Sequence, residues 1–247
     1  MSGPVPARPS SLAGLRAFTA EGRKGDSAPG PAAHGIPVDS PPLDPLQRIA
    51  RRRREPPRPG EHCEMCGEAL DGGHGHVADL EGHRLLCTCR GCYLLFTGEG
   101  AGGRRYRAVP TGSRRLPELA LSASQWDRLQ IPVDLAFFFR QTGVDHVVAC
   151  YPGPGGSTES TLDLSAWSDI EEGNPALRGV AVDVEAVLIR RHGDGFECFI
   201  TPIDACYELV GLVRRHWTGF AGGAEVWARI DDFFGRLRAR SADVAAG

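Results

Sequence analysis

Cysteine is the residue whose placement in this chain most clearly indicates chemistry. Five of the eight cysteines lie within the thirty residues that run from Cys63 to Cys92. Two pairs, Cys63-x2-Cys66 and Cys89-x2-Cys92, are separated by twenty-two residues, a spacing typical of tetrahedral four-cysteine zinc sites. A two-residue gap lets both thiolates of a pair turn toward one ion. We therefore predict that Cys63, Cys66, Cys89 and Cys92 are the ligands of a metal ion.

The choice of ligands stays open at one position. Cys87 precedes Cys89 by two residues, so on an extended strand both side chains would point to the same face. Cys87 could therefore replace Cys89 as a ligand, or lie beside the ion as an unbound thiol. Four nearby histidines are weaker substitutes, because imidazoles next to glycines are usually exposed: His62, His74, His76 and His83.

The ion is expected to be zinc, with iron as the alternative. A rubredoxin-type iron site needs a glycine-bearing knuckle after both cysteine pairs, and four cysteines can also hold an iron–sulfur cluster. Gly67 follows the first pair, whereas Cys92 is followed by the apolar run Tyr93-Leu94-Leu95, which predicts regular structure. Because four thiolates leave no open position on zinc, we predict a structural site and not a catalytic one.

Composition limits the class of protein. A chain of 247 residues, 41% hydrophobic and 24% charged, is expected to form one sizeable core and a small second module. The net charge of −3 argues against a protein that binds nucleic acid through its whole surface. Lys24 is the one lysine in the sequence, so the folded part cannot supply a P-loop, Schiff-base or kinase lysine.

The same sequence predicts where the protein acts. No stretch approaches the roughly 18 to 20 apolar residues that span a bilayer, and the N-terminus has no apolar signal core. Clustered cysteines in such a chain favour metal binding in a reducing compartment over disulfide formation. We therefore expect a cytoplasmic protein with no membrane partner.

Local composition divides the chain into four regions. Residues 1–60 are rich in Pro, Gly, Ala and Ser and are expected to be a disordered tail. The tail includes a basic run at 51–54, which could dock a partner or nucleic acid but is more simply a solvated run of charge. Residues 61–98 are the predicted four-cysteine metal-binding module, 104–240 an α+β domain, and 241–247 a second disordered tail.

The order of elements in the metal module resembles a treble-clef zinc fold. Residues 76–80 and 84–89 are expected to form the two strands of a hairpin. The second cysteine pair then precedes an apolar run at 93–96, which predicts a short helix. A helix N-terminus at this place would stabilise thiolates, because exposed amides favour negative charge there.

The rest of the chain predicts an antiparallel sheet followed by C-terminal helices. Ser122 or Ser124 is expected to cap the first helix of this domain and Asp204 a later one, and a loop is expected at 152–156. The strands are predicted at 106–110, 135–140, 144–151, 182–190 and 196–202, and the helices at 122–129, 164–172, 205–217 and 224–238.

The α+β domain offers only weak candidates for chemistry. Its three cysteines lie among apolar residues and are expected to be core thiols: Cys150, Cys198 and Cys206. The loop at 153–158 could bind an anion, but it lacks the lysine of a P-loop and the following helix of a dinucleotide-binding motif. Three carboxylates are more simply a solvated sheet face than a site: Asp183, Glu185 and Glu197. We predict no catalytic residue and no organic cofactor.

Several separate motifs, in one order, resemble an uncharacterised domain family. They are Cys-Glu-Met-Cys at 63–66, Leu-Leu-Cys-Thr-Cys-Arg-Gly-Cys-Tyr-Leu-Leu-Phe at 85–96, Ile-Pro-Val at 131–133, Tyr-Pro-Gly-Pro at 151–154 and Pro-Ile-Asp-Ala-Cys-Tyr-Glu-Leu-Val at 202–210. Members of this family are typically encoded beside uptake nickel–iron hydrogenase genes in high-GC bacteria. The resemblance covers residues 61–240 and implies a role in hydrogenase assembly, maturation or electron supply, without an activity to carry over.

These observations together predict a non-enzymatic, zinc-binding accessory protein. Its partner is expected to be a protein, with hydrogenase subunits or maturation factors as the candidates. Two hypotheses from other classes remain: an iron-containing electron-transfer protein, and a regulator that binds nucleic acid through the zinc module and the basic run at 51–54. The second is the weaker, because the module has few basic residues. The oligomeric state is not predicted.

Overall fold

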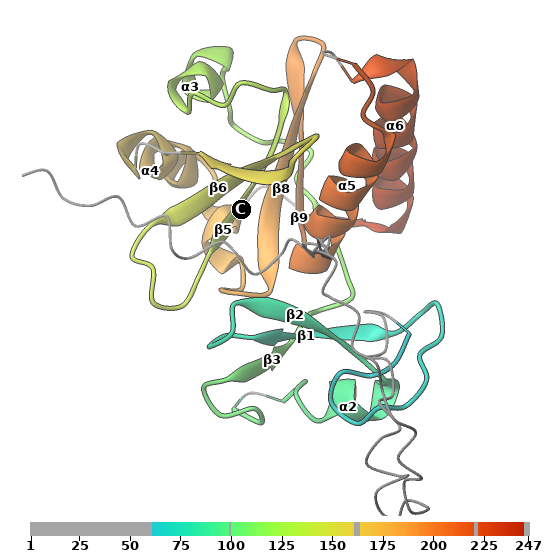
Figure 1. Ribbon diagram of the computed structural model, residues 1–247. Coiled ribbons are helices and arrows are strands. Elements are labelled where there is room, and N and C mark those ends of the chain that lie inside the picture. The colour runs from blue at the N-terminus through green and yellow to red at the C-terminus, as the bar shows by residue number, and fades with distance from the viewer. Residues whose placement is uncertain (1–60, 99, 161–163, 220–221, 245–247) are drawn as a thin grey trace, which may run out of the picture.

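The computed structural model describes residues 61–98, 100–160, 164–219 and 222–244. The predicted tail at 1–60, with its basic run, lies outside the described residues. Within the described part, the chain forms an α+β protein with a three-stranded sheet of order β2-β1-β3 and a seven-stranded sheet of order β10-β4-β9-β8-β5-β6-β7 (Figure 1). The predicted fold class is confirmed.

The small sheet is a hairpin with one added strand. β1 (Gly75–Asp79) and β2 (Arg84–Thr88) pair antiparallel, as the sequence predicted, and β3 (Tyr106–Ala108) pairs antiparallel with the other edge of β1. β3 lies beyond residue 98, where the sequence placed the end of the metal module. A two-stranded hairpin is marginal in water, and a third strand supplies β1 with hydrogen-bond partners on both edges.

The large sheet is antiparallel except at one edge, where β10 pairs parallel with β4. β10 lies within 241–247, which the sequence predicted to be disordered. Backbone hydrogen bonds hold this end, from Ala242 N to the Ser113 carbonyl and from Val244 N to the Arg115 carbonyl. The strands are β4 (Arg114–Arg115), β5 (Leu135–Arg140), β6 (Val147–Gly153), β7 (Gly156–Ser160), β8 (Glu185–His192), β9 (Gly195–Pro202) and β10 (Ala242–Asp243).

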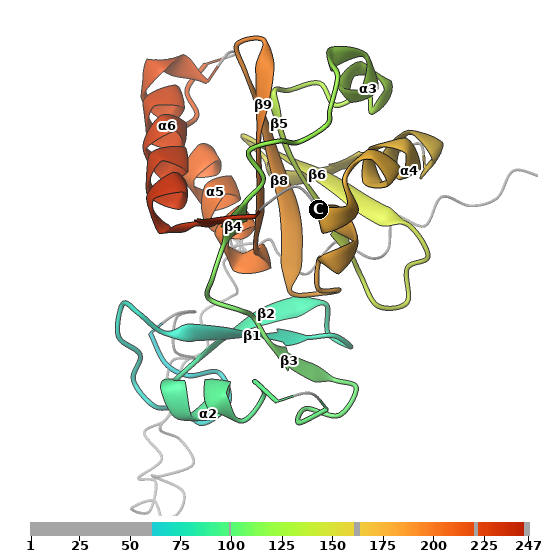
Figure 2. The same ribbon diagram turned by 180° about the vertical axis from the view of Figure 1, so that it is seen from behind.

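Helices cover both faces of the large sheet (Figures 1 and 2). α5 and α6 lie on one face, and α3 and α4 lie on the other. No helix among the described residues has the length and apolar character that crossing a bilayer requires. The helices of this domain are α3 (Ala123–Arg128), α4 (Leu164–Gly173), a 3-10 turn (Pro175–Gly179), α5 (Ile203–His216) and α6 (Gly223–Arg240).

The phenylalanine run in β5 shows how both faces of the sheet are filled. Side chains alternate along a strand, so Phe137 and Phe138 point to opposite faces. Phe137 packs in the core beneath α5 and α6, in a cluster that includes Phe234. Phe138 packs in the core beneath α3 and α4, where its ring stacks on Trp167 at 4.4 Å between centroids. An apolar run of this kind therefore marks a strand buried on both sides.

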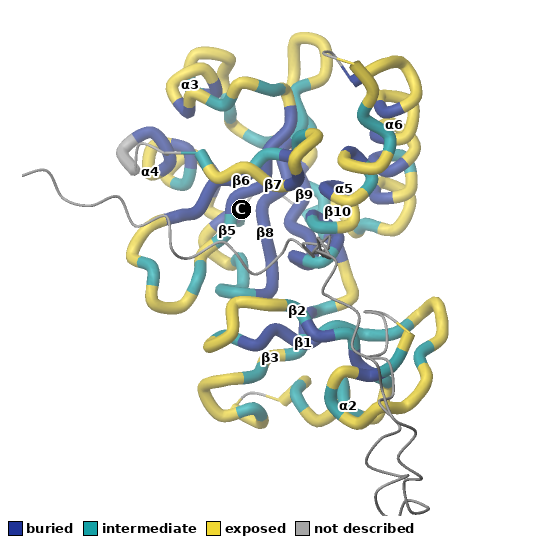
Figure 3. Tube along the Cα trace, viewed as in Figure 1, coloured by how far each residue is buried: buried dark blue, intermediate teal, exposed yellow. Residues whose placement is uncertain are grey.

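The small sheet packs against the larger domain and shares its core. Ala78 of β1 and Val109 are buried in the same cluster as the residues beneath α5 and α6, and Leu80 and Leu85 pack against that cluster. The tube in Figure 3 shows buried segments in both sheets. The metal module is therefore fixed to the domain by apolar contacts as well as by the chain that links them.

Two local predictions differ from the structure. The expected loop at 152–156 is the tight end of the β6–β7 hairpin, in which Gly153 pairs with Gly156, a residue with a φ of +116° that glycine tolerates. Asp204 does not cap a helix, because α5 begins at Ile203, the residue before Asp204, and its N-cap is Pro202. By contrast, Ser122 caps α3 in a capping box, as predicted.

Asp79 anchors the turn of the small sheet. This carboxylate is 2% exposed and accepts hydrogen bonds from Gly82 N at 3.2 Å, Arg84 Nε at 3.3 Å and Arg105 Nε at 3.2 Å. Burial alone would raise the pKa of Asp79, but Arg105, the Gly82 amide and Arg84 together hold that pKa below its ordinary value. One buried carboxylate thus ties the β1–β2 turn to the segment that leads into β3.

We expect Asp79→Asn to destabilise the small sheet by about 1 to 2 kcal/mol, because the buried side chain loses its charge-assisted hydrogen bonds to two half-exposed arginines. Hydrogen exchange at the amides of β1 and β2 in the metal-loaded protein measures this. Glu81→Gln is the matched control, since Glu81 lies 3.6 Å from the same Arg105 but is 69% exposed. It should leave exchange nearly unchanged, and equal effects from both variants would contradict the role of the buried site.

Candidate metal centre

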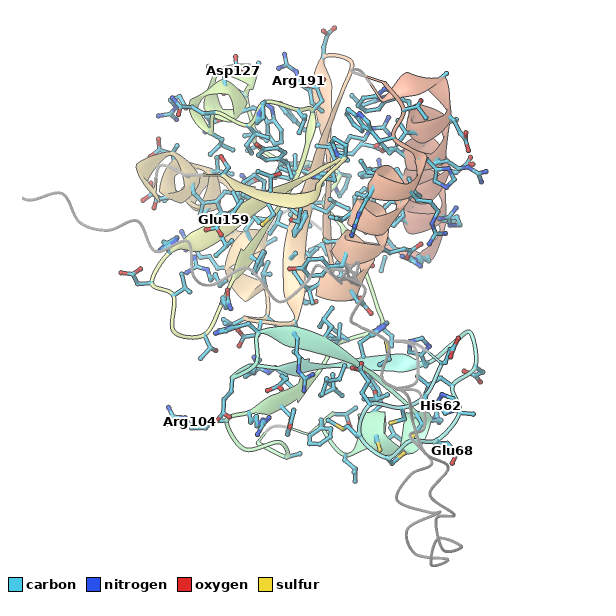
Figure 4. All side chains as sticks on the ribbon, in the orientation of Figure 1. His62, Glu68, Arg104, Asp127, Glu159 and Arg191 are labelled. Carbon is cyan, nitrogen blue, oxygen red and sulfur yellow. The ribbon has the colours of Figure 1, made fainter. Side chains whose placement is uncertain are left out.

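The structure brings the four predicted cysteines together. The sulfur atoms of Cys63, Cys66, Cys89 and Cys92 all lie within 4.8 Å of one another. The Cys66 and Cys89 sulfurs are 3.6 Å apart, close to the ~3.8 Å edge of a tetrahedron with Zn–S bonds of about 2.3 Å. Figure 4 shows sulfur atoms near the labelled His62 and Glu68, at the end of the small sheet beside α2 (Arg90–Leu94). This four-cysteine cluster could hold a metal ion.

The first cysteine pair lies on a tight turn. Cys63 N donates to the Glu68 carbonyl at 2.7 Å, and Gly67 N donates to the Cys63 carbonyl at 2.8 Å. Gly67 has a φ of +80°, which a residue with a side chain rarely adopts. The glycine after the first pair is therefore what lets the chain reverse behind Cys66 and aim both sulfurs at one point.

The second pair lies at the start of a short helix. β2 ends at Thr88, and Cys89 is the N-cap of α2 (Arg90–Leu94). The Cys89 sulfur accepts a hydrogen bond from Cys92 N at 3.5 Å, and Tyr93 N donates to the Cys89 carbonyl at 2.9 Å. The second pair does lie at a helix start, as predicted, but α2 spans Arg90–Leu94 and not the predicted 93–96, so Cys92 lies within it.

The thiols of Cys63 and Cys92 have pKa values shifted in opposite directions. Burial raises the pKa of Cys63, but amide donors of Cys89, Cys66 and Met65 outweigh it and bring that pKa to about 6. Burial and the neighbouring cysteine sulfurs together raise the pKa of Cys92 to about 12. One thiolate thus opposes the formation of the next, and a cation at the centre would remove this opposition by balancing the charge.

Cys87 lies apart from the four-cysteine cluster. Its potential ligand atom lies within 4.8 Å of those of His74 and His76. The rule that residues two apart share a strand face stops applying after Thr88, because the chain leaves β2 and turns into α2 before Cys89. The geometry therefore favours Cys89 over Cys87 for the four-cysteine cluster, and the ligand assignment stays a prediction.

Two of the four histidines considered as substitute ligands, His62 and His83, do not join a cluster of possible ligands within the described residues. His83 is exposed and hydrogen-bonds to Gln141 of the larger domain. His62 has a buried Nδ1 without a hydrogen-bond partner among the described residues, and it bridges to Ala69 through its backbone. Both therefore remain weak candidates as substitute ligands.

The thiols of the larger domain are core residues, as predicted. Cys150, Cys198 and Cys206 are at most 1% exposed. Burial raises the pKa of Cys150 to about 11 and raises the pKa values of Cys198 and Cys206 as well. A thiol that stays protonated at neutral pH is a poor nucleophile. These cysteines pack the core and do not suggest a catalytic site.

The three predicted carboxylates of the sheet have separate partners. The Asp183 carboxylate accepts two hydrogen bonds from Thr142, from its backbone N and its hydroxyl, both at 2.6 Å. Glu185 pairs with Arg114 in a bidentate contact at 2.9 and 3.0 Å, and Glu197 pairs with Arg238. Each carboxylate thus has its own partner, and they do not form an acid–base pair.

Fold and site together define an α+β protein with a four-cysteine cluster on a small sheet. The chain belongs to a family of unknown function, DUF5947, whose model matches residues 62–241. The match begins immediately before Cys63 and covers the small sheet and every strand of the large sheet except β10. No curated protein and no solved structure matches the chain.

We expect Cys89→Ser to weaken metal binding at the four-cysteine cluster by more than about 100-fold. Losing a ligand costs more affinity than the 10- to 100-fold typical of losing an outer hydrogen-bond partner. Titration with Co²⁺, monitored by thiolate charge-transfer absorbance, measures the affinity. Cys87→Ser is the matched control in the same module and should retain the ion at the four-cysteine cluster. The reverse result, with Cys87→Ser the damaging variant, would exchange the two assignments.

Proposed function

We propose that this chain is a non-enzymatic, zinc-binding accessory protein that presents a docking surface to a partner protein in the cytoplasm. The observation that carries the proposal is the cluster of four cysteine sulfurs within 4.8 Å of one another. Four thiolates complete the coordination of a tetrahedral ion and leave no position for a substrate. Such a site serves folding, and function then lies in the surface that the metal shapes.

The preference for zinc over iron rests on the second cysteine pair. A rubredoxin-type site has a glycine knuckle after both pairs, and Gly67 supplies one after Cys66 only. Cys92 lies inside α2, and its amide hydrogen-bonds to the Cys89 sulfur. A knuckle followed by a helix start is the arrangement of treble-clef zinc modules, so we infer that the module belongs to that class.

The ion would connect α2 to the turn that carries Cys63 and Cys66, in addition to contacts such as the hydrogen bond from the Tyr93 hydroxyl to the Val109 carbonyl at 2.9 Å. α2 is only five residues long and has no buried residue, so it would not persist as an isolated helix. Its anchors are Cys89 and Cys92, and the opposite pair lies on the turn at Cys63 and Cys66. Bound zinc would therefore fix α2 against the turn at Cys63 and Cys66.

The surface that this arrangement presents is apolar. Leu94 and Leu95, directly after Cys92, are 52% and 64% exposed. The module offers few free cations to nucleic acid, because Arg90 is the one arginine in α2, and Arg84 and Arg105 at the β1–β2 turn both pair with Asp79. We infer that α2 is a protein-docking element.

The link to a nickel–iron hydrogenase system rests on the motif resemblance alone, and we propose the partner to be a hydrogenase subunit or maturation factor.

Metal content provides the first test. We expect the full-length protein, purified anaerobically, to contain zinc and to be colourless, because zinc thiolates do not absorb visible light. Mass spectrometry for metals and a visible spectrum measure this. Iron with thiolate-to-iron absorbance would instead make the chain an electron-transfer protein and refute the structural role of the site.

Docking through α2 leads to a separate test. In a bacterium that encodes this protein beside an uptake hydrogenase, we expect deletion to lower hydrogenase activity and the wild-type gene to restore it. The double variant Leu94→Ser, Leu95→Ser should fail to restore activity while still binding zinc, because its two exposed side chains do not touch the ion. Full complementation by this variant would exclude α2 as the docking element, and unchanged activity on deletion would exclude the hydrogenase link.

A further inference from the structure

A second group of potential metal ligands lies beside the four-cysteine cluster. One ligand atom from each of His74, His76 and Cys87 lies within 4.8 Å of the other two. The rings of His74 and His76 meet edge to face, with centroids 4.9 Å apart. Two imidazoles and a thiol form a different donor set from four thiols, and none of the three belongs to the four-cysteine cluster.

The register of the hairpin brings these side chains together. His76 of β1 pairs directly with Cys87 of β2. Side chains directly opposite one another on paired strands lie on the same face of a sheet. His74 precedes His76 by two residues, just before β1 begins. Strand pairing therefore brings His76 and Cys87 together, and His74 joins them from the residue before β1.

Each histidine is oriented by a hydrogen bond at Nδ1. His74 Nδ1 lies 3.1 Å from the Asp71 carbonyl, and His76 Nδ1 lies 2.7 Å from Asp204 Oδ2. Carbonyl and carboxylate oxygens only accept, so Nδ1 carries the proton in both rings, and in a neutral ring Nε2 keeps its lone pair. Histidines that bind metals commonly donate their other nitrogen to such an oxygen.

The remaining nitrogen of His74 has no protein partner among the described residues. Its Nε2 is buried and has no hydrogen bond to any of them. A buried polar atom without a partner is costly in a folded protein, and coordination of an ion would use the lone pair of this nitrogen. The same ring has its Nδ1 satisfied, so the unpaired atom is the one that would face an ion.

A cavity of about 310 Å³ adjoins the two histidines. His74 and His76 line it, together with Asp204, Glu208 and Arg240 from the larger domain, whereas Cys87 does not line it. An ion held by the three residues would thus have protein on the side of Cys87 and open space on the side of the histidines. Its fourth position would be accessible to water or a small molecule.

We propose that His74, His76 and Cys87 form a second metal site, for a borderline divalent ion such as Zn²⁺, with a fourth position open to the cavity. Imidazole and thiolate suit ions of this class, and three protein ligands with one open position distinguish reactive zinc sites from structural ones. The site draws its ligands from the small sheet and the partner of His76, Asp204, from α5.

The test uses full-length protein and counts bound Co²⁺ as a spectroscopic substitute for zinc. We expect two ions per chain, one with the strong absorbance of several thiolates and one with the weaker absorbance of a single thiolate. A wild-type protein that binds one ion at saturation would overturn the proposal, whatever its variants do. Because the two spectra differ, failure of this site is distinguishable from failure of the four-cysteine site.

His76→Gln and Cys87→Ser are expected to lose the second ion, with affinity at least about 100-fold weaker, and to keep the first. The retained first ion shows that the module is still folded. His146→Gln is the control, because His146 is exposed on the larger domain and pairs with its neighbour Asp145, away from the small sheet. Two ions in His76→Gln, or loss of the second ion in His146→Gln, would refute the assignment.

Asp204 is a positioning residue in this proposal, since it acts on the ion through His76. Asp204→Asn should weaken the second ion by about 10- to 100-fold and leave the first unchanged. Unchanged affinity for the second ion would remove Asp204 from the site.

Azide added to the two-cobalt protein should shift the weaker bands only, and an unchanged spectrum would show that the fourth position is closed.

Discussion

The pairing of β1 with β2 is the interaction on which the rest of the small module depends. Its register places His76 opposite Cys87, and it places Ala78 opposite Leu85, where both pack against the larger domain. β2 ends at Thr88, and the next residue, Cys89, is the N-cap of α2. A slip of one residue would move every side chain to the other face. One hairpin thus determines the docking of the module, the position of the second cysteine pair and the composition of the histidine–cysteine group.

The two groups of potential ligands are neighbours with different chemical character. Four sulfurs with no open position suit a structural ion, whereas two imidazoles and a thiol beside a cavity suit an ion that exchanges a ligand. Glu64, between the cysteines of the first pair, joins the two groups, because its backbone N donates to the Cys87 carbonyl at 2.9 Å and its carboxylate accepts from Cys87 N at 2.7 Å. Loss of order at one group would therefore reach the other through the backbone.

The larger domain contributes more than support. Its core receives Ala78 of β1 and Val109, the residue after β3, and its helix α5 places Asp204 against His76. A carboxylate in the first turn of a helix usually serves that helix, and Asp204 does accept from Ala205 N with its other oxygen. The two contacts together make the start of α5 part of the module's surroundings.

Sequence alone determined the four-cysteine pattern, the α+β class and most helices and strands, because pair spacing, alternation and helical periodicity are local properties. It placed β5 at residues 135–140 and expected a helix to follow the second cysteine pair. Only the tertiary structure decided that Cys87 leaves the other cysteines, that β3 completes the small sheet, and that Asp204 meets His76 from 128 residues away. Those outcomes depend on strand register and on the packing of one sheet against another domain, which residues close in sequence do not encode.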